Sequence, residues 1–220
     1  MKTALTDRLG LDLPIIQAPM AGTSTPELAA AVSNAGALGS ISIASVDAVE
    51  GRRQIQALKA LTTRPFNVNL FCHAPTPPDP TRDRAWIDSL RPLFAQFRAA
   101  PPETLTEIYQ SFLTDDAKLA VLLDEKPAVV SFHFGLPQAE KIPALKSAGC
   151  LLIASATTPE EGRQAQAAGV DMVVAQGFEA GGHRGVFDPA DDPRFATLPL
   201  TRLLARELDI PVIAAGGIMD

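Results

Sequence analysis

Seven short apolar runs recur along this chain of 220 residues, and helix-like segments separate most of them. Each run has the length and the flanking residues of a strand that is buried on both faces of a parallel sheet. Such an alternation, with no all-helical or all-β block, predicts either a doubly wound sheet or a (β/α)8 barrel. The runs cover residues 14–20, 38–43, 66–71, 128–134, 151–157, 172–177 and 211–218.

The helix-like segments share one layout. In the segment 25–36, Thr25 is placed as an N-cap, Pro26 occupies the first helical position and Gly36 ends the helix. The segment 158–169 repeats this layout and also ends in a glycine. A left-handed glycine between each helix and the next strand is typical of a repeated βα unit.

Polar residues within two of the runs favour the barrel. Asn67 and Asn69 share one face of FNVNLF, and Ser131 and His133 share one face of VVSFHF, whereas the alternate residues up to Phe134 are apolar. In a barrel the apolar face meets the outer helices, and polar side chains at the carboxyl ends of the strands point into the mouth, where active sites lie. We therefore predict an α/β fold of the TIM (β/α)8 barrel type, with about seven strands present and the eighth missing.

The longest connection between runs predicts a helical insertion at about 74–127, within a single domain that spans 1–220. It opens with the proline-rich APTPPDP and contains two amphipathic stretches, 83–100 and 104–113. Trp86, Phe97 and Phe112 recur there at helical spacing, which indicates core packing.

The charge pattern excludes some partners. The net charge is −6 and the Lys and Arg residues are scattered, so we expect no nucleic acid partner. No run approaches the roughly 20 apolar residues of a membrane span, and Asp7 and Asp12 interrupt the N-terminal segment where a signal peptide would be apolar. We expect a soluble, cytoplasmic protein without a membrane partner.

Cysteine and histidine spacing gives no metal site. Cys72 and Cys150 each lie in or beside an apolar run, where a free cysteine packs as a small hydrophobe. No pair of histidines shares a helix face with a carboxylate at metal-ligand spacing.

Glycines dominate the stretch AQGFEAGGHRG, residues 175–185. Its bare backbone can approach a flat ring or an anion closely, and Gln176 offers both a donor and an acceptor to a heterocycle. A mobile surface loop is the alternative. In AAGGI, Gly216 and Gly217 follow a strand directly, which suits a phosphate or a simple tight turn. No GxGxxG opens a first βα unit, so a Rossmann site is not indicated.

Three histidines compete for a catalytic role. His73 borders the proline-rich segment, and His183 lies in the glycine-rich stretch, where it could bind an anion or be exposed. His133 alone has the strand phase that aims it at the mouth. A buried structural histidine would give the same pattern, so the residues alone leave catalysis and structure open.

Six motifs in order, PIIQAPMAG, FNVNLF, VSFHFGLP, SATT, AQGFEAGGHRG and IPVIAAGGI, resemble the nitronate monooxygenases, formerly called 2-nitropropane dioxygenases. The resemblance covers the whole chain. It implies an FMN-binding TIM barrel that oxidises alkyl nitronates, propionate 3-nitronate among them, with O2 to a carbonyl compound and nitrite. It also implies that His133 is the catalytic base. The flavin contacts that it implies are Met20, Asn69, Gln176, Gly181, Gly182 and Gly217.

The sequence departs from this family after the seventh run, because the eighth strand and its phosphate turn are absent. We therefore expect this chain to bind FMN weakly or not at all, and to be inactive unless the remainder is supplied. Two other functions stay open: an FMN-dependent enoyl-acyl carrier protein reductase, which shares EAGGH and AAGGI, and an inactive truncated fragment of a flavin barrel. The expected partners are a small-molecule nitronate and O2, and a homodimer is compatible with the sequence.

Overall fold

The computed structural model describes residues 2–219, and the chain divides into two compact units. One unit comprises the residues up to His73 together with those from Tyr109 onward, and the other is Ala74–Ile108. The first unit contains the sheet, and the second contains one long helix.

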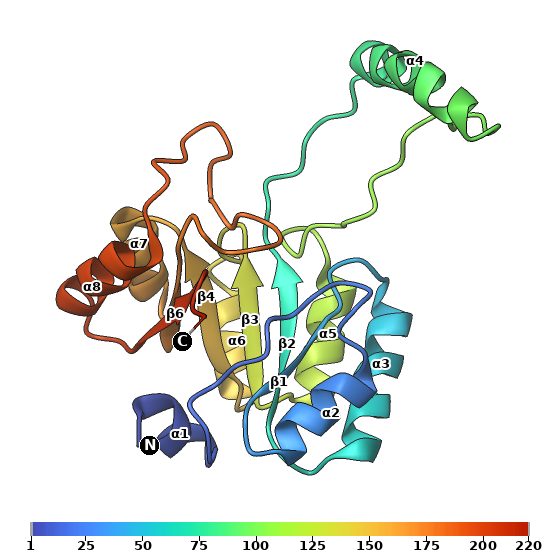
Figure 1. Ribbon diagram of the computed structural model, residues 1–220. Helices are drawn as coiled ribbons and strands as arrows, with labels where there is room; N and C mark the ends of the chain where they lie inside the picture. Colours follow the sequence, from blue (N-terminus) through green and yellow to red (C-terminus); the bar gives the residue numbers. More distant parts are fainter. Residues whose placement is uncertain (1, 220) are drawn as a thin grey trace. The chain divides into compact units, whose positions relative to one another are not determined.

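The sheet unit is a single curled sheet of six parallel strands whose order in space follows their order in the chain (Figure 1). In a doubly wound sheet the strand order reverses at a switch point, whereas here each new strand is added on the same side of the last one. The barrel type is thereby confirmed. The strands are β1 (Gly39–Ser42), β2 (Phe66–Phe71), β3 (Val129–His133), β4 (Leu151–Ala156), β5 (Met172–Gln176) and β6 (Val212–Ala215).

Two helices precede β1, and at least one helix lies in every later crossover. The helices of the sheet unit are α1 (Ala4–Leu9), α2 (Pro26–Asn34), α3 (Ala48–Leu61), α5 (Asp116–Glu125), α6 (Lys141–Ser147), α7 (Pro159–Ala168) and α8 (Thr197–Glu207). Figure 1 shows α2 and α3 near β1 and β2, and α7 and α8 near β4 to β6. The expected caps are confirmed, since the Thr25 hydroxyl accepts a hydrogen bond from the Leu28 N–H and Gly169 ends α7 in a left-handed conformation.

The two faces of the sheet differ as the strand phase predicts. Val68, Val130 and Phe132 are fully buried against the helices in the main apolar core. On the inner face, Val129 and Met172 belong to a smaller apolar cluster with residues of the α1 region. The inner side chains become polar towards the carboxyl ends of the strands, which is where the candidate site lies.

The predicted strand at 14–20 is wrong, since this segment makes only a single parallel bridge between Ile16 and Leu38. The Gln17 side chain ends the ladder: its Oε1 accepts from the Ser40 N–H at 3.2 Å and its Nε2 donates to the Ser40 carbonyl at 3.2 Å. A carboxamide here takes the place of the next peptide group. The segment is therefore held to β1 without continuing as a strand.

The strand at 128–134 also ends earlier than predicted. β3 stops at His133, and Phe134 has a left-handed backbone with φ of 65°. Its ring consequently leaves the helix-facing side and packs edge-on against Phe71, with the ring centroids 4.9 Å apart.

The predicted helical insertion at 74–127 is shorter in the structure. Its separate unit ends at Ile108, whereas α5 packs against α3 in the sheet unit. No helix forms at 104–113, because the Phe112 N–H binds the Phe71 carbonyl at 2.8 Å and the ring stacks against Phe132.

The unit Ala74–Ile108 contains the helix α4 (Pro80–Gln96). Trp86 and Phe97 are exposed in it, so the expectation of core packing is confirmed for Phe112 but wrong for these two residues. Across residues 2–219 no helix has both the length and the apolar character that crossing a bilayer demands.

The two hydrogen bonds between the Gln17 side chain and the Ser40 backbone can be tested by substitution. Gln17→Leu keeps the approximate size but leaves the N–H and C=O of Ser40 without these partners, which should lower the free energy of unfolding by about 1–3 kcal/mol. Urea unfolding measures the change. Gln54→Leu is the matched control, because Gln54 binds only the Glu50 side chain on the surface of α3, and its effect should stay within about 0.5 kcal/mol. Equal effects of the two substitutions would show that the hydrogen bonds between Gln17 and Ser40 do not stabilise the fold.

Candidate active site

His133 is the last residue of β3, at the carboxyl edge of the sheet, and both of its ring nitrogens have partners. Nδ1 lies 3.0 Å from the Ser155 hydroxyl on β4, and Nε2 lies 3.2 Å from the His183 carbonyl oxygen in the glycine-rich loop. The rings of Phe71 and Phe134 flank the imidazole, with centroids 5.9 and 4.4 Å away. The ring is therefore held between a strand, a loop and two aromatic side chains.

The surroundings keep this imidazole neutral. Burial lowers the pKa of His133 from 6.5 to about 4, because desolvation disfavours the charged form, and the hydrogen bond to the His183 carbonyl only partly opposes this effect. At neutral pH the ring consequently carries one hydrogen and one lone pair. Either can serve in proton transfer or in anion binding.

Gln176, at the end of β5, binds the glycine-rich loop through both ends of its carboxamide. Its Nε2 donates to the His183 carbonyl at 2.9 Å, and its Oε1 accepts from the Gly185 N–H at 2.7 Å. The predicted donor and acceptor are both present, but in this structure they fix the loop. A contact between Gln176 and the flavin stays a prediction.

Arg184 also serves the loop. Its guanidinium makes two hydrogen bonds to the Asp192 carboxylate, at 3.1 and 2.9 Å, and another to the Gln176 carbonyl. Since Asp192 pairs with the charge of Arg184, the pKa of this carboxyl group lies below its usual range. These contacts order the loop and argue against the alternative prediction that residues 175–185 form a mobile surface loop.

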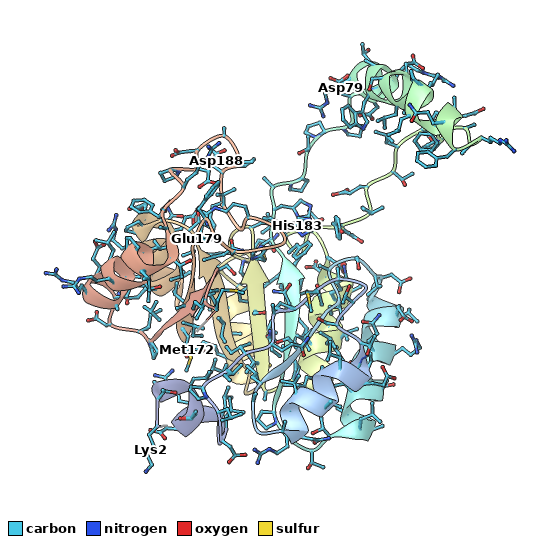
Figure 2. The ribbon with its side chains drawn as sticks, viewed as in Figure 1. Lys2, Asp79, Met172, Glu179, His183 and Asp188 are labelled. Atoms are coloured by element: carbon cyan, nitrogen blue, oxygen red, sulfur yellow. The ribbon has the colours of Figure 1, made fainter. Side chains whose placement is uncertain are left out.

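The His183 ring joins an aromatic group that the strand pattern did not reveal. Figure 2 shows His183 above the carboxyl ends of the strands, at the opposite end of the sheet from Met172. Its centroid lies 5.7 Å from that of Phe71, 5.9 Å from that of Tyr109 and 5.6 Å from that of Phe134. Tyr109 reaches this group from the segment that was predicted to be helical.

The other predicted flavin contacts are spread over four regions. Asn69 is buried on the inner face of β2, where its Nδ2 donates to the Ser131 hydroxyl at 3.0 Å. Gly181 and Gly182 are exposed and have open space where a side chain would be. Gly217 follows β6 with φ of 61°, and Met20 is exposed in the loop before α2. None of these five residues makes a hydrogen bond to the His133 side chain, whose partners are Ser155 and the His183 carbonyl.

A second carboxylate organises the turn after β6. The Glu179 Oε2 accepts hydrogen bonds from the Thr197 N–H at 2.8 Å and from its hydroxyl at 3.0 Å. These contacts supply the cap that the side chain of Ala196 cannot give to α8. The Thr197 hydroxyl oxygen also lies 2.9 Å from the Gly216 carbonyl oxygen, so its one hydrogen is shared between Glu179 and Gly216 and Thr197 links AAGGI to the glycine-rich loop.

The inner face keeps one polar atom without a partner. Asn67 is buried, its Nδ2 donates to the Ser40 hydroxyl at 3.2 Å, and its Oδ1 has no hydrogen-bond donor within residues 2–219. A buried acceptor in this state carries a desolvation cost. It fits a bound group that presents an N–H or O–H to this face, as a flavin does.

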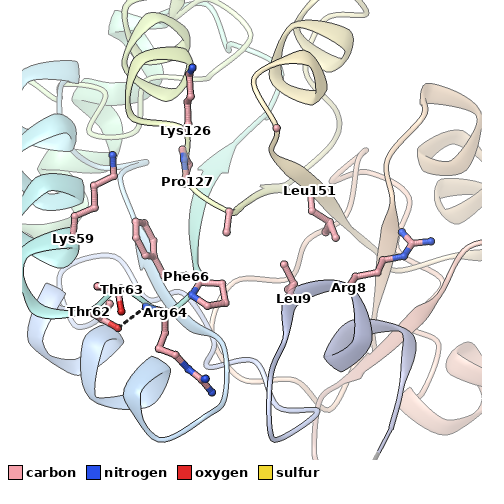
Figure 3. A pocket seen from close by; sticks show the side chains of 13 residues that line it. Arg8, Leu9, Lys59, Thr62, Thr63, Arg64, Phe66, Lys126, Pro127 and Leu151 are labelled. Carbon is pink, nitrogen blue, oxygen red and sulfur yellow. Dashed lines mark hydrogen bonds between the residues drawn. The ribbon is translucent and has the colours of Figure 1, made fainter.

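A cavity of about 660 Å³ lies at the other end of the strands and is separate from this site (Figure 3). Two of the cations on its rim are paired, since Lys59 binds Glu125 and Arg64 binds Asp12, and the described residues that line it include no histidine or carboxylate that could act as a base. Figure 3 shows the Lys59 and Arg64 side chains directed away from each other around its rim. We therefore assign the candidate site to the carboxyl edge.

Metal and thiol chemistry have no support at this edge. Within residues 2–219 no group of three or more His, Cys, Asp or Glu side chains could hold a metal ion. Burial raises the pKa of the Cys72 thiol far above its usual value and raises that of Cys150 to about 11. Both cysteines are therefore unreactive thiols at neutral pH.

Comparison with known proteins identifies the family. The sequence profile described as nitronate monooxygenase matches residues 2–220. The chain belongs to the nitronate monooxygenase family. A protein named nitronate monooxygenase from Paraburkholderia phytofirmans is 59% identical over 220 residues, which are 100% of this chain and 60% of that protein.

Solved structures agree with this membership. A nitroalkane oxidase from Streptomyces ansochromogenes superposes with a TM-score of 0.88 at 42% identity, covering 99% of this chain and 62% of that one. FabK from Thermotoga maritima gives a TM-score of 0.73 at 31% identity, covering 100% and 56%. The chain thus spans about three fifths of the relatives that it matches. Membership of the nitronate monooxygenase family implies a flavin cofactor.

The close packing of the loop on His133 gives one prediction. A Cβ atom at Gly185 would lie 2.5 Å from the His133 Cε1 and 2.9 Å from its Nδ1. Gly185→Ala should therefore displace the ring and lower the free energy of unfolding by about 1–3 kcal/mol. Urea unfolding and the NMR signals of the imidazole measure both effects. Gly181→Ala is the control, because nothing lies within 4 Å of its Cβ position, and an unmoved ring in Gly185→Ala would refute the packing argument.

The lowered pKa of His133 gives a second prediction. Between about pH 6.5 and pH 4 the unfolded chain binds a proton at His133 that the folded chain does not bind, so stability should fall as the pH falls through this range. The loss should reach at most about 3 kcal/mol.

Chemical denaturation across this pH range, with wild type and His133→Asn compared, isolates the effect. The variant cannot titrate at this position, so the stability difference between the two proteins should narrow as the pH falls. Parallel pH profiles would contradict a buried neutral His133.

Proposed function

We propose that this chain takes part in the FMN-dependent oxidation of alkyl nitronates, propionate 3-nitronate among them, with O2 to a carbonyl compound and nitrite. Membership of the nitronate monooxygenase family supports the reaction class. The observation that carries the role of this chain is the position of His133, a neutral imidazole at the carboxyl edge of a parallel sheet. Catalytic residues of barrel enzymes lie at this edge.

The chain's own residues would bind and orient the substrate. When substrate takes the place of one of the present partners of the ring, the neutral imidazole offers either a lone pair that can remove the acidic α-proton of a nitroalkane or an N–H that can hold an anionic nitronate. The aromatic side chains of Phe71, Tyr109 and Phe134 limit the access of water to this place. We propose His133 as the catalytic base.

The residues proposed to hold FMN are Met20, Asn69, Gln176, Gly181, Gly182 and Gly217. The unpaired Asn67 Oδ1 on the inner face and the open space at Gly181 and Gly182 support a fit to a flat heterocycle with N–H and O–H groups. When bound, the flavin supplies electron transfer and the reaction with O2. A homodimer and a cytoplasmic location stay predictions of the sequence.

The enoyl-acyl carrier protein reductase is the weaker alternative. The likeness to the nitroalkane oxidase is higher in both identity and TM-score than the likeness to FabK. The assay that separates them uses the flavin-loaded complete enzyme, and so do the activity tests below. Nitrite release from a nitronate without NAD(P)H supports the proposed nitronate oxidation. Flavin reduction by NAD(P)H with turnover of an enoyl thioester would overturn this proposal and support the reductase.

His133→Asn tests the base. Asparagine keeps an N–H donor but has no basic lone pair, so nitrite release from a neutral nitroalkane should fall by about 10²- to 10⁴-fold, and turnover of the preformed nitronate should fall much less. Flavin absorbance of the variant should equal that of wild type.

Two results would count against the base. The first is undiminished turnover of the neutral nitroalkane by His133→Asn. The second is a wild-type protein that oxidises only the preformed nitronate, because removal of an α-proton would then be no part of its reaction.

A further inference from the structure

Ser155 lies on the same inner face of the sheet as His133, one strand away. β3 and β4 pair in parallel with Phe132 opposite Ala154, so the next residues along, His133 and Ser155, lie level with each other. The Ser155 hydroxyl oxygen is 3.0 Å from Nδ1 of the imidazole. Ser155 therefore contacts the ring from the strand side, opposite to the loop.

The hydrogen-bond partner on the loop side determines the tautomer. The atom 3.2 Å from Nε2 is the His183 carbonyl oxygen, which can only accept a hydrogen bond. Nε2 must then carry the ring hydrogen. In the neutral imidazole Nδ1 is consequently the unprotonated nitrogen, and the Ser155 hydroxyl donates to it.

We infer that Ser155 is a positioning residue for His133, which holds the orientation of the ring by donating to Nδ1, while the His183 carbonyl sets the nitrogen that carries the hydrogen. Its role in the reaction rests on the proposed function of His133. Its contact with the ring does not, because the two side chains meet without any ligand. A serine at this place also leaves the apolar packing undisturbed, since the neighbouring Ala154 and Ala156 are the residues that face the helices.

The loop gives the ring one hydrogen bond. The His183 carbonyl belongs to a segment that Gln176 holds through its carboxamide, and Gly185 packs directly on the ring edge. The Ser155 hydroxyl, carried by a buried strand, binds the other ring nitrogen. Without Ser155 the ring keeps a single hydrogen bond and gains freedom to rotate about its Cβ–Cγ bond.

NMR of the full chain with ¹⁵N-labelled histidine tests this inference. The sequence has three histidines, and the spectrum of His133→Asn identifies the signals of His133 by their absence. At neutral pH the wild type should show Nδ1 unprotonated and Nε2 protonated. Ser155→Ala should keep the hydrogen on Nε2 but shift the Nδ1 signal, because Nδ1 loses its hydrogen-bond donor. Ser155→Thr should restore the wild-type signal, because threonine keeps the hydroxyl and suits a strand.

Ser131→Ala is the matched control. Ser131 lies on the same inner face and binds Asn69 in place of His133, so this variant should keep the wild-type Nδ1 signal of His133. A wild-type chain with the hydrogen on Nδ1, or a folded Ser155→Ala chain that keeps the wild-type signals, would overturn the inference. Backbone amide spectra establish that each variant is folded.

Activity separates this inference from the proposed function. In the flavin-loaded protein Ser155→Ala should lower kcat by about tenfold, the equivalent of one lost hydrogen bond, with little change in KM, and Ser155→Thr should recover most of it. The predicted Nδ1 signals together with no nitrite release from wild type would overturn the proposed function and leave the contact between Ser155 and His133 intact. Nitrite release from wild type together with an unchanged Nδ1 signal in Ser155→Ala would overturn the inference and support the proposed function.

Discussion

The carboxamide of Gln176 joins the end of β5 to the glycine-rich loop through two hydrogen bonds, and the surroundings of His133 depend on these bonds. One amide end holds the carbonyl of His183 and the other holds the N–H of Gly185. That carbonyl is the acceptor for Nε2 of His133, and Gly185 packs against the ring. The burial that lowers the pKa of His133 is therefore produced partly by a loop that a single side chain keeps in place.

The loop has few apolar contacts of its own, so polar anchors at both ends must hold it. Near its start Gln176 performs this task, and farther along Glu161 does so. The buried Glu161 carboxylate accepts hydrogen bonds from the N–H and the hydroxyl of Thr157 and from the N–H of Phe187 at 2.7 Å. Three donors satisfy this buried charge without a cation, as a carboxylate requires when it leaves water. The loop is ordered by directional bonds, and such bonds allow fewer positions than apolar packing does.

Strand phase predicted the sheet because its period of two follows from backbone geometry alone, and it failed where a side chain or an unusual dihedral intervened. The segment around Ile16 has the composition of a strand, yet Gln17 uses its amide to end the ladder. Phe134 continues the apolar alternation, yet its left-handed backbone turns it out of the strand. Phe112 fits a helical pattern at 104–113, but its backbone pairs with β2. Each failure is a local pattern overridden by one tertiary hydrogen bond or one dihedral angle.

The site was predictable only where its residues act through side chains on strands. His133 and Gln176 could be placed at the carboxyl edge from their phase and from the runs that contain them. Ser155 was part of the SATT motif but had no assigned task, because its partner lies on another strand. His183 serves His133 through its carbonyl group, which any residue could supply, so no side-chain pattern reports it. The glycine at 185 is required for a related reason, since a Cβ atom there would occupy the space of the imidazole. Part of the glycine-rich motif therefore leaves room for the His133 ring and need not contact a ligand. Close approach to a neighbouring ring, and not only conformational freedom, can explain why a position in this motif is glycine.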